Sequence, residues 1–158
     1  MKFSQLTVAI IITLCMISCA NARYRYRHRY HNSERSENNL DGAPLDVCGT
    51  DPMTGYWRNG KCSTGRSDYG THTVCAVMTD DFLLYSKSKG NDLITPRSWG
   101  FPGLKAGDHW CLCAIRWREA LKAPEGDKAP PVFLSATNKE TLRYVSRDIL
   151  ESHEYQEK

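Results

Sequence analysis

The chain has 158 residues, with 21 Lys and Arg against 18 Asp and Glu, which gives a formal net charge of +3. A chain of this length suits one domain, which buries roughly two-thirds of its unfolded surface and does not depend on crosslinks to fold. From residue 40 onward the basic and acidic counts are 15 and 16, so the body lacks the concentrated positive charge of a nucleic-acid-binding domain, and no nucleic acid is expected as a partner.

Residues 1–22 have the pattern of a secretory leader. Lys2 precedes an apolar run at 6–17, which is followed by the small residues of Ala20-Asn21-Ala22. A basic start, an apolar stretch and an A-x-A site in this order are typical of a cleaved signal peptide. The run is shorter than the roughly 20 apolar residues that cross a bilayer, so no transmembrane segment is expected. We therefore predict a secreted, extracellular protein that is cleaved after Ala22.

Residues 23–39 form a basic segment in which arginine alternates with tyrosine. Because the segment lacks the aliphatic residues that build a core, we expect it to be disordered. Two interpretations are open: a solvated linker left after cleavage, which we favour, or a contact for an extracellular polyanion or matrix component. In the second interpretation the anion pairs with guanidinium groups, namely those of Arg23, Arg25, Arg27 and Arg29.

Residues 40–158 have the composition of a globular domain, in which short strand-like and helix-like runs alternate. The strongest local signal is the Asn-Gly pair at 59–60, which is typical of a hairpin turn. In the first half of the domain, the pattern predicts a strand at 44–48, a hairpin over 56–64, a strand at 71–78, and a helix that is capped at Thr79 or Asp80 and ended by Gly90. In the second half it predicts a strand at 110–115, a helix at 117–122 and a strand at 132–134. A helix at 138–143 follows behind a Thr137–Glu140 capping box, and a last helix is capped by Ser146. We predict a single small α+β domain with a short mixed or antiparallel sheet, flanking short helices and long Gly/Pro-rich loops.

The segment at 91–108 is a long predicted loop that is rich in glycine and proline. Segments of this kind are uncommon in compact domains and usually carry a function, so we expect a polar pocket there. Asp92 and Asp108 lie near its ends, and Arg116 is a partner that could clamp a carboxylate. We favour a turn-holding role for both acids, because Asp commonly bonds back to the backbone in turns.

Five of the seven cysteines remain after the leader is removed. An odd count allows at most two internal disulfides and leaves one thiol free or intermolecular, and an oxidising compartment favours the disulfides. Cys111 and Cys113 point the same way along a strand, so each is better placed to meet a partner on a facing element. The disulfide candidates are Cys48, Cys62, Cys75, Cys111 and Cys113, with the pairing left open.

Two other kinds of chemistry are open to these sulfurs. The first is a zinc site, whose ligands would be Cys75, Cys111, Cys113 and His109. A C-x-C pair with scattered single cysteines differs from the usual spacing of zinc ligands, so no cofactor is expected and zinc is the alternative. The second is catalysis, which needs a cysteine and a histidine within hydrogen-bond reach. Cys113 with His72 is one open pair and Cys75 with His109 is another, although we favour His72 as a polar residue of an edge strand.

Four runs of the body carry a resemblance to a known family. They are Cys48-Gly49-Thr50-Asp51-Pro52, His72-Thr73-Val74-Cys75-Ala76, Gly90-Asn91-Asp92-Leu93 and residues 101–120. Together they resemble the bacterial-type family called domain of unknown function 2237, and the resemblance implies no particular activity. This chain departs from that family at Lys61-Cys62, where the family has adjacent cysteines, and in its leader, which the relatives usually lack.

Two hypotheses follow from these observations. The first is a disulfide-stabilised extracellular protein that acts by binding or as a matrix-associated structural protein, and the absence of common enzyme motifs favours it. The second is a small Cys/His-dependent enzyme or a metal-binding domain. The catalytic candidates of the second hypothesis are Cys75, Cys113, His72, Asp92, Asp108 and Arg116.

Overall fold

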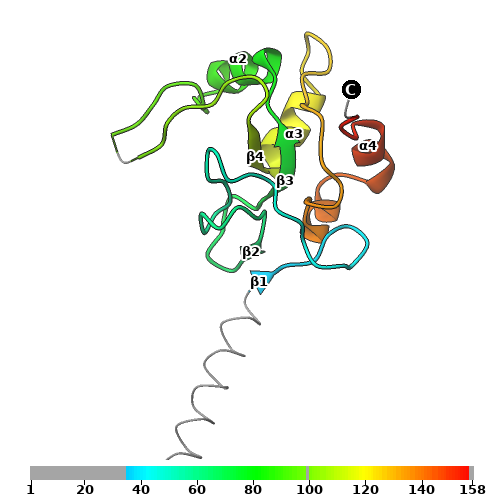
Figure 1. Cartoon of the computed structure of the whole chain (residues 1–158). Helices are drawn as coiled ribbons and strands as arrows, with labels where there is room; N and C mark the ends of the chain where they lie inside the picture. The colour runs from blue at the N-terminus through cyan, green and yellow to red at the C-terminus, as the bar shows by residue number, and fades with distance from the viewer. Residues whose placement is uncertain (1–34, 99, 157–158) are drawn as a thin grey trace, which may run out of the picture. The chain divides into compact units, whose positions relative to one another are not determined.

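A computed structural model of the chain describes residues 35–98 and 100–156 (Figure 1). The predicted leader and the four tail arginines lie outside the described residues. The unit that carries the fold begins at Ser36. Among the described helices, none has the length and apolar character that a membrane crossing requires.

The last residues of the predicted tail are hydrogen-bonded into this unit. The N–H of Leu45 donates to the carbonyl of Glu37 at 2.8 Å, and the N–H of Lys139 donates to that of Asn38 at 3.0 Å. The next residue, Asn39, is buried. Residues 37–39 therefore contribute backbone contacts to the fold.

A two-stranded antiparallel sheet lies at the centre and consists of β3 (His72–Val77) and β4 (His109–Cys113). Both strands are rich in β-branched, aromatic or other apolar residues, which suit a pleated and buried surface. All of β3 after its first residue is buried. Together with the helices around it, this sheet confirms the predicted α+β class.

The register of the two strands brings the cysteines and a histidine together. Cys75 lies opposite Cys111, and His72 lies opposite Cys113. The register shifts between His72 and Val74, as at a β-bulge, which bends a strand and changes the direction of nearby side chains. The His72 end of the sheet therefore differs in geometry from the regular pairing at the other end.

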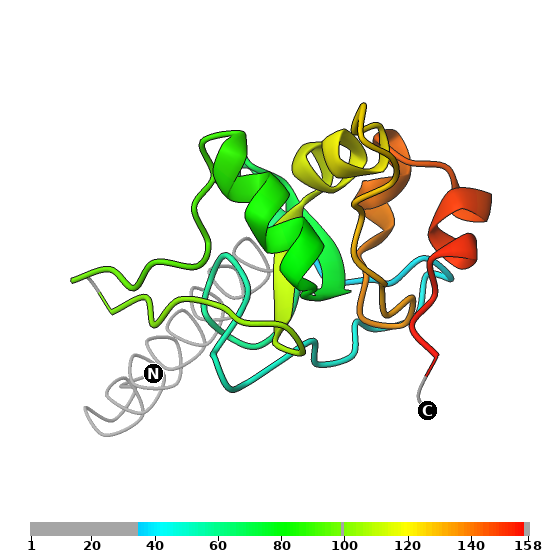
Figure 2. The same cartoon turned by 90° about the horizontal axis from the view of Figure 1, so that it is seen from above.

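Short helices pack around the sheet (Figure 2). They are α2 (Asp80–Ser88), α3 (Ala114–Leu121), the 3-10 helix η1 (Lys139–Arg143) and α4 (Arg147–Ser152), and two-residue strands are present at β1 (Arg35–Ser36) and β2 (Thr64–Gly65). The predicted cap of α2 is confirmed, because the Thr79 hydroxyl accepts from the N–H of Phe82 at 3.2 Å. The core beneath the helices includes the fully buried Trp117, whose indole N–H donates to the Pro130 carbonyl at 2.9 Å.

The predictions of a strand at 44–48 and of a hairpin over 56–64 are wrong. The chain bends at the Asn-Gly pair, where the N–H of Lys61 donates to Oδ1 of Asn59, but the carbonyl of Gly60 accepts from the N–H groups of Cys48 and Gly49, at 2.8 and 3.3 Å. The turn therefore binds a different loop instead of joining two paired strands. This whole region up to β2 is held by turns and, as described below, by disulfides.

The junction between β4 and α3 lies earlier than predicted. The strand ends at Cys113 and the helix begins at the next residue, whereas the sequence pattern predicted a helix from 117. Ala114 follows the end of the strand, and its N–H donates to the carbonyl of Thr71, the residue before β3, at 3.0 Å. Ala114, Trp117 and Ala120 are all buried, so the apolar helical spacing already starts at 114.

The C-terminal region differs from the prediction in two details. Val132 forms isolated bridges with Ala76 and with Glu154 instead of a strand. The cap of η1 is Asn138, whose side chain accepts from the N–H of Glu140 at 3.0 Å. Thr137, which the sequence pattern predicted as the cap, donates its hydroxyl to the Phe133 carbonyl instead.

Candidate functional site

Two buried disulfides tie the N-terminal loops to the sheet. They join Cys48 to Cys75 and Cys62 to Cys111, with Cα–Cα distances of 5.6 and 5.3 Å. The Sγ atoms of Cys48, Cys62 and Cys75 all lie within 4.8 Å of one another, so the two bonds are neighbours in the core. The predicted presence of disulfide bonds is confirmed, and the pairing that the sequence left open is now assigned.

Cys113 is the free cysteine of the described chain, and it is half-buried. It is the last residue of β4 and the residue directly before α3. Cys113 is therefore the N-cap residue of α3, at the end of the helix where the dipole is positive, although its side chain makes no capping hydrogen bond. Cysteines at helix N-termini and beside a cationic histidine are the ones that react as nucleophiles.

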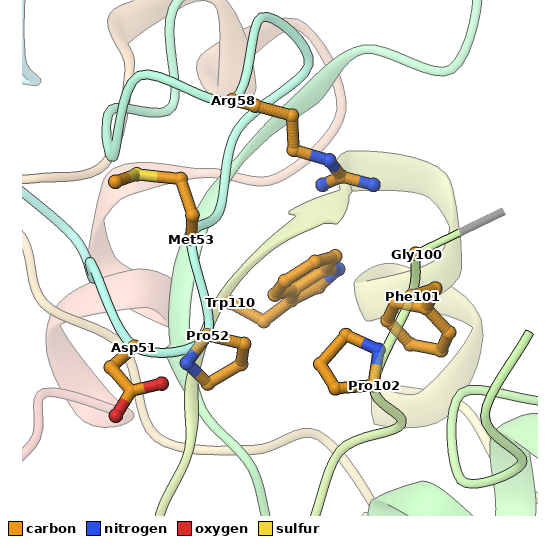
Figure 3. A pocket seen from close by; sticks show the side chains of 8 residues that line it. All are labelled: Asp51, Pro52, Met53, Arg58, Gly100, Phe101, Pro102 and Trp110. Atoms are coloured by element: carbon orange, nitrogen blue, oxygen red, sulfur yellow. The ribbon is translucent and has the colours of Figure 1, made fainter.

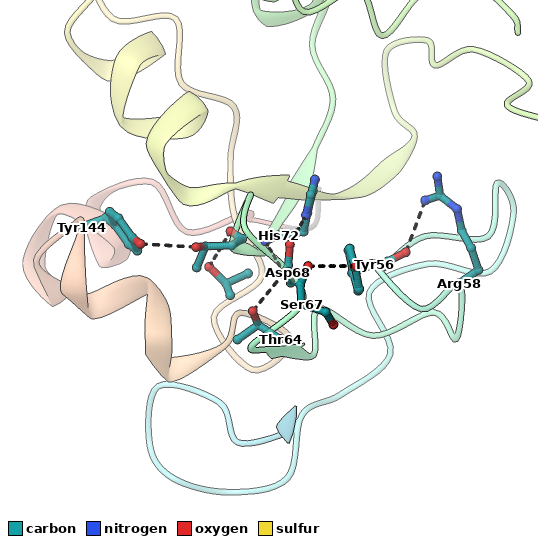
Figure 4. Close-up of polar contacts among 10 residues, drawn as sticks. Tyr56, Arg58, Thr64, Ser67, Asp68, His72 and Tyr144 are labelled. Atoms are coloured by element: carbon teal, nitrogen blue, oxygen red, sulfur yellow. Dashed lines mark hydrogen bonds and ion pairs between the residues drawn. The ribbon is translucent and has the colours of Figure 1, made fainter. Parts of the chain in front are cut away.

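His72 and Asp68 complete a chain of polar contacts with this thiol. His72 is the register partner of Cys113, and the nearby Cys113 side chain is one of the causes that raise the pKa of His72. The Nδ1 atom of His72 lies 2.6 Å from Oδ1 of Asp68 (Figure 4). We call Cys113, His72 and Asp68 the thiol cluster.

The Asp68 carboxylate is held firmly from several sides. Its side chain has 0% of its surface exposed. Besides the imidazole, it accepts the N–H of His72 at 2.8 Å and the hydroxyl of Thr64 at 2.9 Å. A buried carboxylate is expensive unless it is paired and hydrogen-bonded, so these donors explain how Asp68 can lie in the interior.

His72 and Asp68 are both charged at neutral pH. The hydrogen bond to Asp68, followed by the hydrogen bond to Cys113, raises the pKa of His72 to about 10. Burial acts to raise the pKa of Asp68, but the hydrogen bonds and charge of His72 and the hydrogen bond from Thr64 together lower it below its usual value. His72 is therefore an imidazolium and Asp68 a carboxylate near pH 7.

The backbone around His72 is shaped to hold the imidazole. Thr71 has a φ of 51°, which is unusual for a β-branched residue, and such outliers cluster at functional sites. A Cβ added at Gly70 would lie 2.5 Å from Cε1 of the His72 ring. The absence of a side chain at Gly70 therefore makes the room in which the ring lies.

His72 also lines a cavity of about 500 Å³. The phenol ring of Tyr56 stacks on the His72 ring at 6.0 Å between centroids, and it lines the same cavity. A second cavity of about 470 Å³ adjoins it and shares the residues Arg58, Phe101 and Trp110 (Figure 3). We call these two cavities together the Arg58 cleft. Cavities of a few hundred Å³ are of the size that binds small molecules.

Asp92 lies on the wall of the Arg58 cleft, as expected for a residue of the long loop. Its carboxylate accepts from the hydroxyl and N–H of Thr95 and from the N–H of Ile94, and these bonds lower its pKa. Lys87 and Arg97 lie 3.3 and 3.8 Å from it. The residue thus holds a turn and also faces the cleft.

The remaining candidates make local contacts. Asp108 accepts from the N–H and the ammonium of Lys105, at 2.9 and 3.0 Å, and Arg116 donates to Glu119 at 2.8 Å. The Nδ1 atom of His109 lies 3.0 Å from the Cys48 carbonyl. Cys75 and Cys111 belong to different disulfides. Because zinc binds deprotonated thiols, these two sulfurs cannot serve as zinc ligands while the disulfides are intact.

Sequence reasoning missed Asp68, Gly70, Tyr56 and Arg58. Asp68 precedes His72 by four residues in a segment that reads as loop, so no periodicity points to it. A polar pair that brackets a glycine, as Asp68 and His72 bracket Gly70, is the one local signal available. Tyr56 and Arg58 belong to the region where the hairpin prediction is wrong.

Comparison with known families gives one match. The model of a family described as an uncharacterized protein conserved in bacteria, DUF2237, matches residues 38–154. The matched range includes both disulfides, the thiol cluster and the Arg58 cleft. The comparison with curated proteins finds no match.

Proposed function

The chain belongs to the DUF2237 family, as its sequence motifs predicted, and we propose that it is a cysteine-dependent acyl hydrolase. In this proposal Cys113 is the nucleophile, His72 donates and accepts the proton, and Asp68 is a positioning residue. The observation that carries the proposal is the position of His72 between Cys113, its partner across the sheet, and the buried Asp68 carboxylate, which lies 2.6 Å from its Nδ1 atom. This arrangement has the three roles of a nucleophile, a base and an orienting acid that acyl transfer requires.

The charge state of His72 fixes the order of the proton transfers. Because its pKa is about 10, His72 already carries a proton at pH 7 and serves first as an acid. The Cys113 sulfur, after its thiol has released a proton to solvent, attacks the carbonyl carbon of an ester, thioester or amide, so that a C–S bond forms and the carbonyl electrons move to oxygen. As this intermediate collapses, the bond to the leaving group breaks and the leaving heteroatom takes the proton of His72.

The second half of the cycle restores the enzyme. A water molecule attacks the carbonyl carbon of the thioester and gives its proton to the neutral imidazole of His72. The C–S bond breaks and leaves the sulfur with its electron pair. The net reaction adds one water across one acyl bond and needs no oxidant or reductant.

A redox role is less well supported by the same sulfurs. The four disulfide-bonded cysteines are 0–3% exposed, and they are Cys48, Cys62, Cys75 and Cys111. Thiol–disulfide exchange with an outside partner needs an accessible bond. Acyl chemistry at the half-buried Cys113 needs only access to that one thiol.

Alkylation of Cys113 tests the proposed charge state of the cluster. At pH 7 and without reductant, iodoacetamide should modify the cleaved chain that begins at Arg23 once, at Cys113, and His72→Ala should slow this reaction about ten-fold. The reason is that the His72 imidazolium beside the sulfur favours the negative charge on the reacting sulfur, and alanine removes it. A time course of intact mass measures the rate.

A matched control is His153→Gln, which removes an imidazole that pairs with an aspartate, Asp127, at 2.7 Å. Its rate should equal that of the wild type. In the same assay 4-nitrophenyl acetate should place an acetyl group on Cys113 that is later lost to water, and Cys113→Ala should not acquire it. Equal alkylation of His72→Ala and wild type, or a failure to form the acetyl adduct, refutes the proposal.

We further propose that the protein acts outside the cell, which leaves extracellular binding or a matrix-associated role as the second candidate function. Two buried disulfides support this location, because oxidising compartments preserve such bonds. The predicted leader supports it independently. Contact with a polyanion through Arg23, Arg25, Arg27 and Arg29 belongs to the same proposal.

Mass spectrometry of protein from the culture medium tests the location. The mature chain should begin at Arg23, with one alkylatable thiol before reduction and five after it, as the cysteine count after residue 22 requires. Retention in the cell with residues 1–22 attached, or four or more free thiols in the native protein, contradicts it.

A further inference from the structure

The Arg58 side chain lies on an aromatic surface at the centre of the cleft. Its guanidinium carbon is 4.8 Å from the centre of the Trp110 ring, and Figure 3 shows Arg58 reaching over that ring from one wall while Phe101 stands on the other. Trp110 and Phe101 meet edge to face with their centroids 5.6 Å apart. Stacking on an aromatic face fixes the plane of the guanidinium, so its donors have a defined direction.

The loop that carries Arg58 adopts an unusual backbone conformation to do this. Arg58 has a φ of 52° although it is not glycine. Its N–H donates to the Gly55 carbonyl at 3.0 Å, and its Nη1 donates to the same carbonyl at 3.3 Å. A left-handed non-glycine residue costs on the order of 1 kcal/mol and persists where the surrounding structure imposes it. The backbone of this turn therefore fixes where the guanidinium lies.

Most of the hydrogen-bonding capacity of Arg58 remains available. A guanidinium has five N–H donors, and within the part of the chain that the structure describes its side chain donates to one acceptor, the Gly55 carbonyl. No carboxylate of those residues forms an ion pair with it. A fork of donors with no protein anion to bind matches the geometry of a carboxylate or phosphate group.

The larger cavity has an excess of positive charge. Arg58 and Arg97 line it, and Asp92 is the acid among the lining residues. The His72 imidazolium also lines it, but its charge is balanced by the Asp68 carboxylate at 2.6 Å. Asp92 is in turn compensated by Lys87 at 3.3 Å. An anion that enters this cavity therefore meets a favourable field.

Apolar side chains are exposed on both sides of Arg58. Met53, in the smaller cavity, is 44% exposed, and Tyr56, in the larger one, is 41% exposed. Exposed apolar groups around a few convergent polar groups are the usual lining of a small-molecule site. The ligand that fits such a lining has an apolar body next to its anionic group.

We propose that the Arg58 cleft binds a small organic oxyanion, with its carboxylate or phosphate on the Arg58 fork and its apolar body against Tyr56 or Met53. His72 is the member of the thiol cluster that lines the same cavity as Arg58, so an anion bound to Arg58 can direct the rest of the molecule toward the His72 ring. The lining of the cleft therefore indicates the substrate class of the proposed hydrolase, which is an acyl compound that carries an anionic group in addition to its acyl bond. To that extent the inference rests on the proposed function, although binding itself does not.

Binding of matched probes tests the anion site in the Cys113→Ser variant, where no covalent reaction interferes. Benzoate and phenyl phosphate present the two oxyanions on one apolar ring, and benzamide is the uncharged analogue. We expect at least one anion to bind at least ten-fold more tightly than benzamide, measured by NMR shifts of the Trp110 indole N–H. The preferred anion distinguishes a carboxylate from a phosphate ligand. Equal affinities for all three probes, or no binding up to millimolar concentrations, would overturn the site.

Substitutions at Arg58 locate the contact. Arg58→Gln should weaken anion binding at least ten-fold, and Arg58→Lys should restore part of it, because Lys keeps the charge but loses the planar fork. Arg143→Gln makes the same charge change at a surface residue that pairs with Glu140 at 2.9 Å, and its affinity should equal that of the unsubstituted protein. Equal loss in both Gln variants would mean a nonspecific charge effect and would refute the contact.

A protection experiment separates this inference from the proposed function. In the wild type, the bound anion should slow alkylation of Cys113, and in Arg58→Gln it should not. Anion binding without protection overturns the assignment of the cleft as the substrate site and leaves the thiol chemistry intact. Anion binding in a protein whose alkylation does not depend on His72 leaves the anion site intact and refutes the hydrolase.

Discussion

Replacement of both Cys62 and Cys111 by alanine is expected to lower the free energy of unfolding by about 2–4 kcal/mol. The bond links residues 49 apart in the sequence, and a crosslink that closes a loop of that length strongly restricts the unfolded chain. The region between residue 44 and β2 has no strand or helix of its own. Its position against the sheet therefore depends on this bond more than on regular hydrogen bonding. Urea unfolding followed by tryptophan fluorescence measures the loss, in a Cys113→Ser background that prevents thiol exchange.

The second disulfide is the matched control for this experiment. Cys48 and Cys75 are 27 residues apart, so the loop-closure model gives their removal a cost lower by roughly 0.5 kcal/mol. Both pairs are buried to a similar degree, so the difference between the variants reports mainly on loop length. A loss below about 1 kcal/mol for the Cys62–Cys111 pair would show that turn contacts alone hold the loops.

Elements whose signal is local could be predicted from the sequence. The run at 71–78 is β-branched and apolar, and it forms β3 at 72–77 because burial of those side chains suits a strand. The cap at Thr79 and the stop at Gly90 bracket α2 for reasons contained in a few adjacent residues. The α+β class follows from elements of this kind.

Elements that depend on distant contacts could not be predicted. The Asn-Gly pair at 59–60 indicates a hairpin locally, but the disulfide at Cys62 and the bond from Cys48 to the Gly60 carbonyl commit this region to other partners. Tertiary contacts routinely override a turn signal of this strength, because each disulfide contributes more than a short hairpin does. Because Tyr56 and Arg58 were placed in this incorrectly predicted hairpin, they were not proposed as site residues.

The candidate site shows the same division. Cys113 and His72 could be proposed as a pair from residue types alone, since strands bring distant positions together. The cross-strand register that makes them neighbours needs the bulge at His72, which no sequence pattern indicates. Asp68 contacts the imidazole only because the loop between β2 and β3 folds back against His72. Residue chemistry thus suggested the pair, and only the fold supplied its third member.

Substitution of Asp68 by asparagine is expected to change both reactivity and the pH dependence of stability. Asparagine has nearly the same shape but no charge, so the largest cause that raises the pKa of His72 is removed. Alkylation of Cys113 at pH 7 should fall about ten-fold, because less imidazolium remains beside the reacting sulfur. Acylation by 4-nitrophenyl acetate should fall at least as much, since the imidazole also loses its orientation.

The sign of the pH effect on stability follows from the two pKa values of His72. Its folded value of about 10 lies above the unfolded value of 6.5, so the folded state binds the proton more tightly. This contribution is fully present below pH 6.5 and is lost as the pH rises toward 10. For Asp68 the folded pKa is lowered, so its contribution is present above pH 3.8 and is lost as the pH falls. The wild type should therefore lose stability as the pH rises from 6.5 toward about 10.

Thermal unfolding at pH 6 and pH 9 measures this loss. We expect the midpoint of the wild type to fall by about 4 °C, which corresponds to roughly 1 kcal/mol for a domain of this size, after allowance for screening of the partly exposed His72. Asp68→Asn should show little of this fall, whereas Asp127→Asn, at the His153–Asp127 pair, should keep it.

Gly70→Ala is the second test, because its Cβ displaces the His72 ring without removing any charged group. If Asp68→Asn and Gly70→Ala both keep the wild-type midpoints and the wild-type alkylation rate, the thiol cluster does not act as a unit, and Cys113 reacts as an ordinary half-buried thiol.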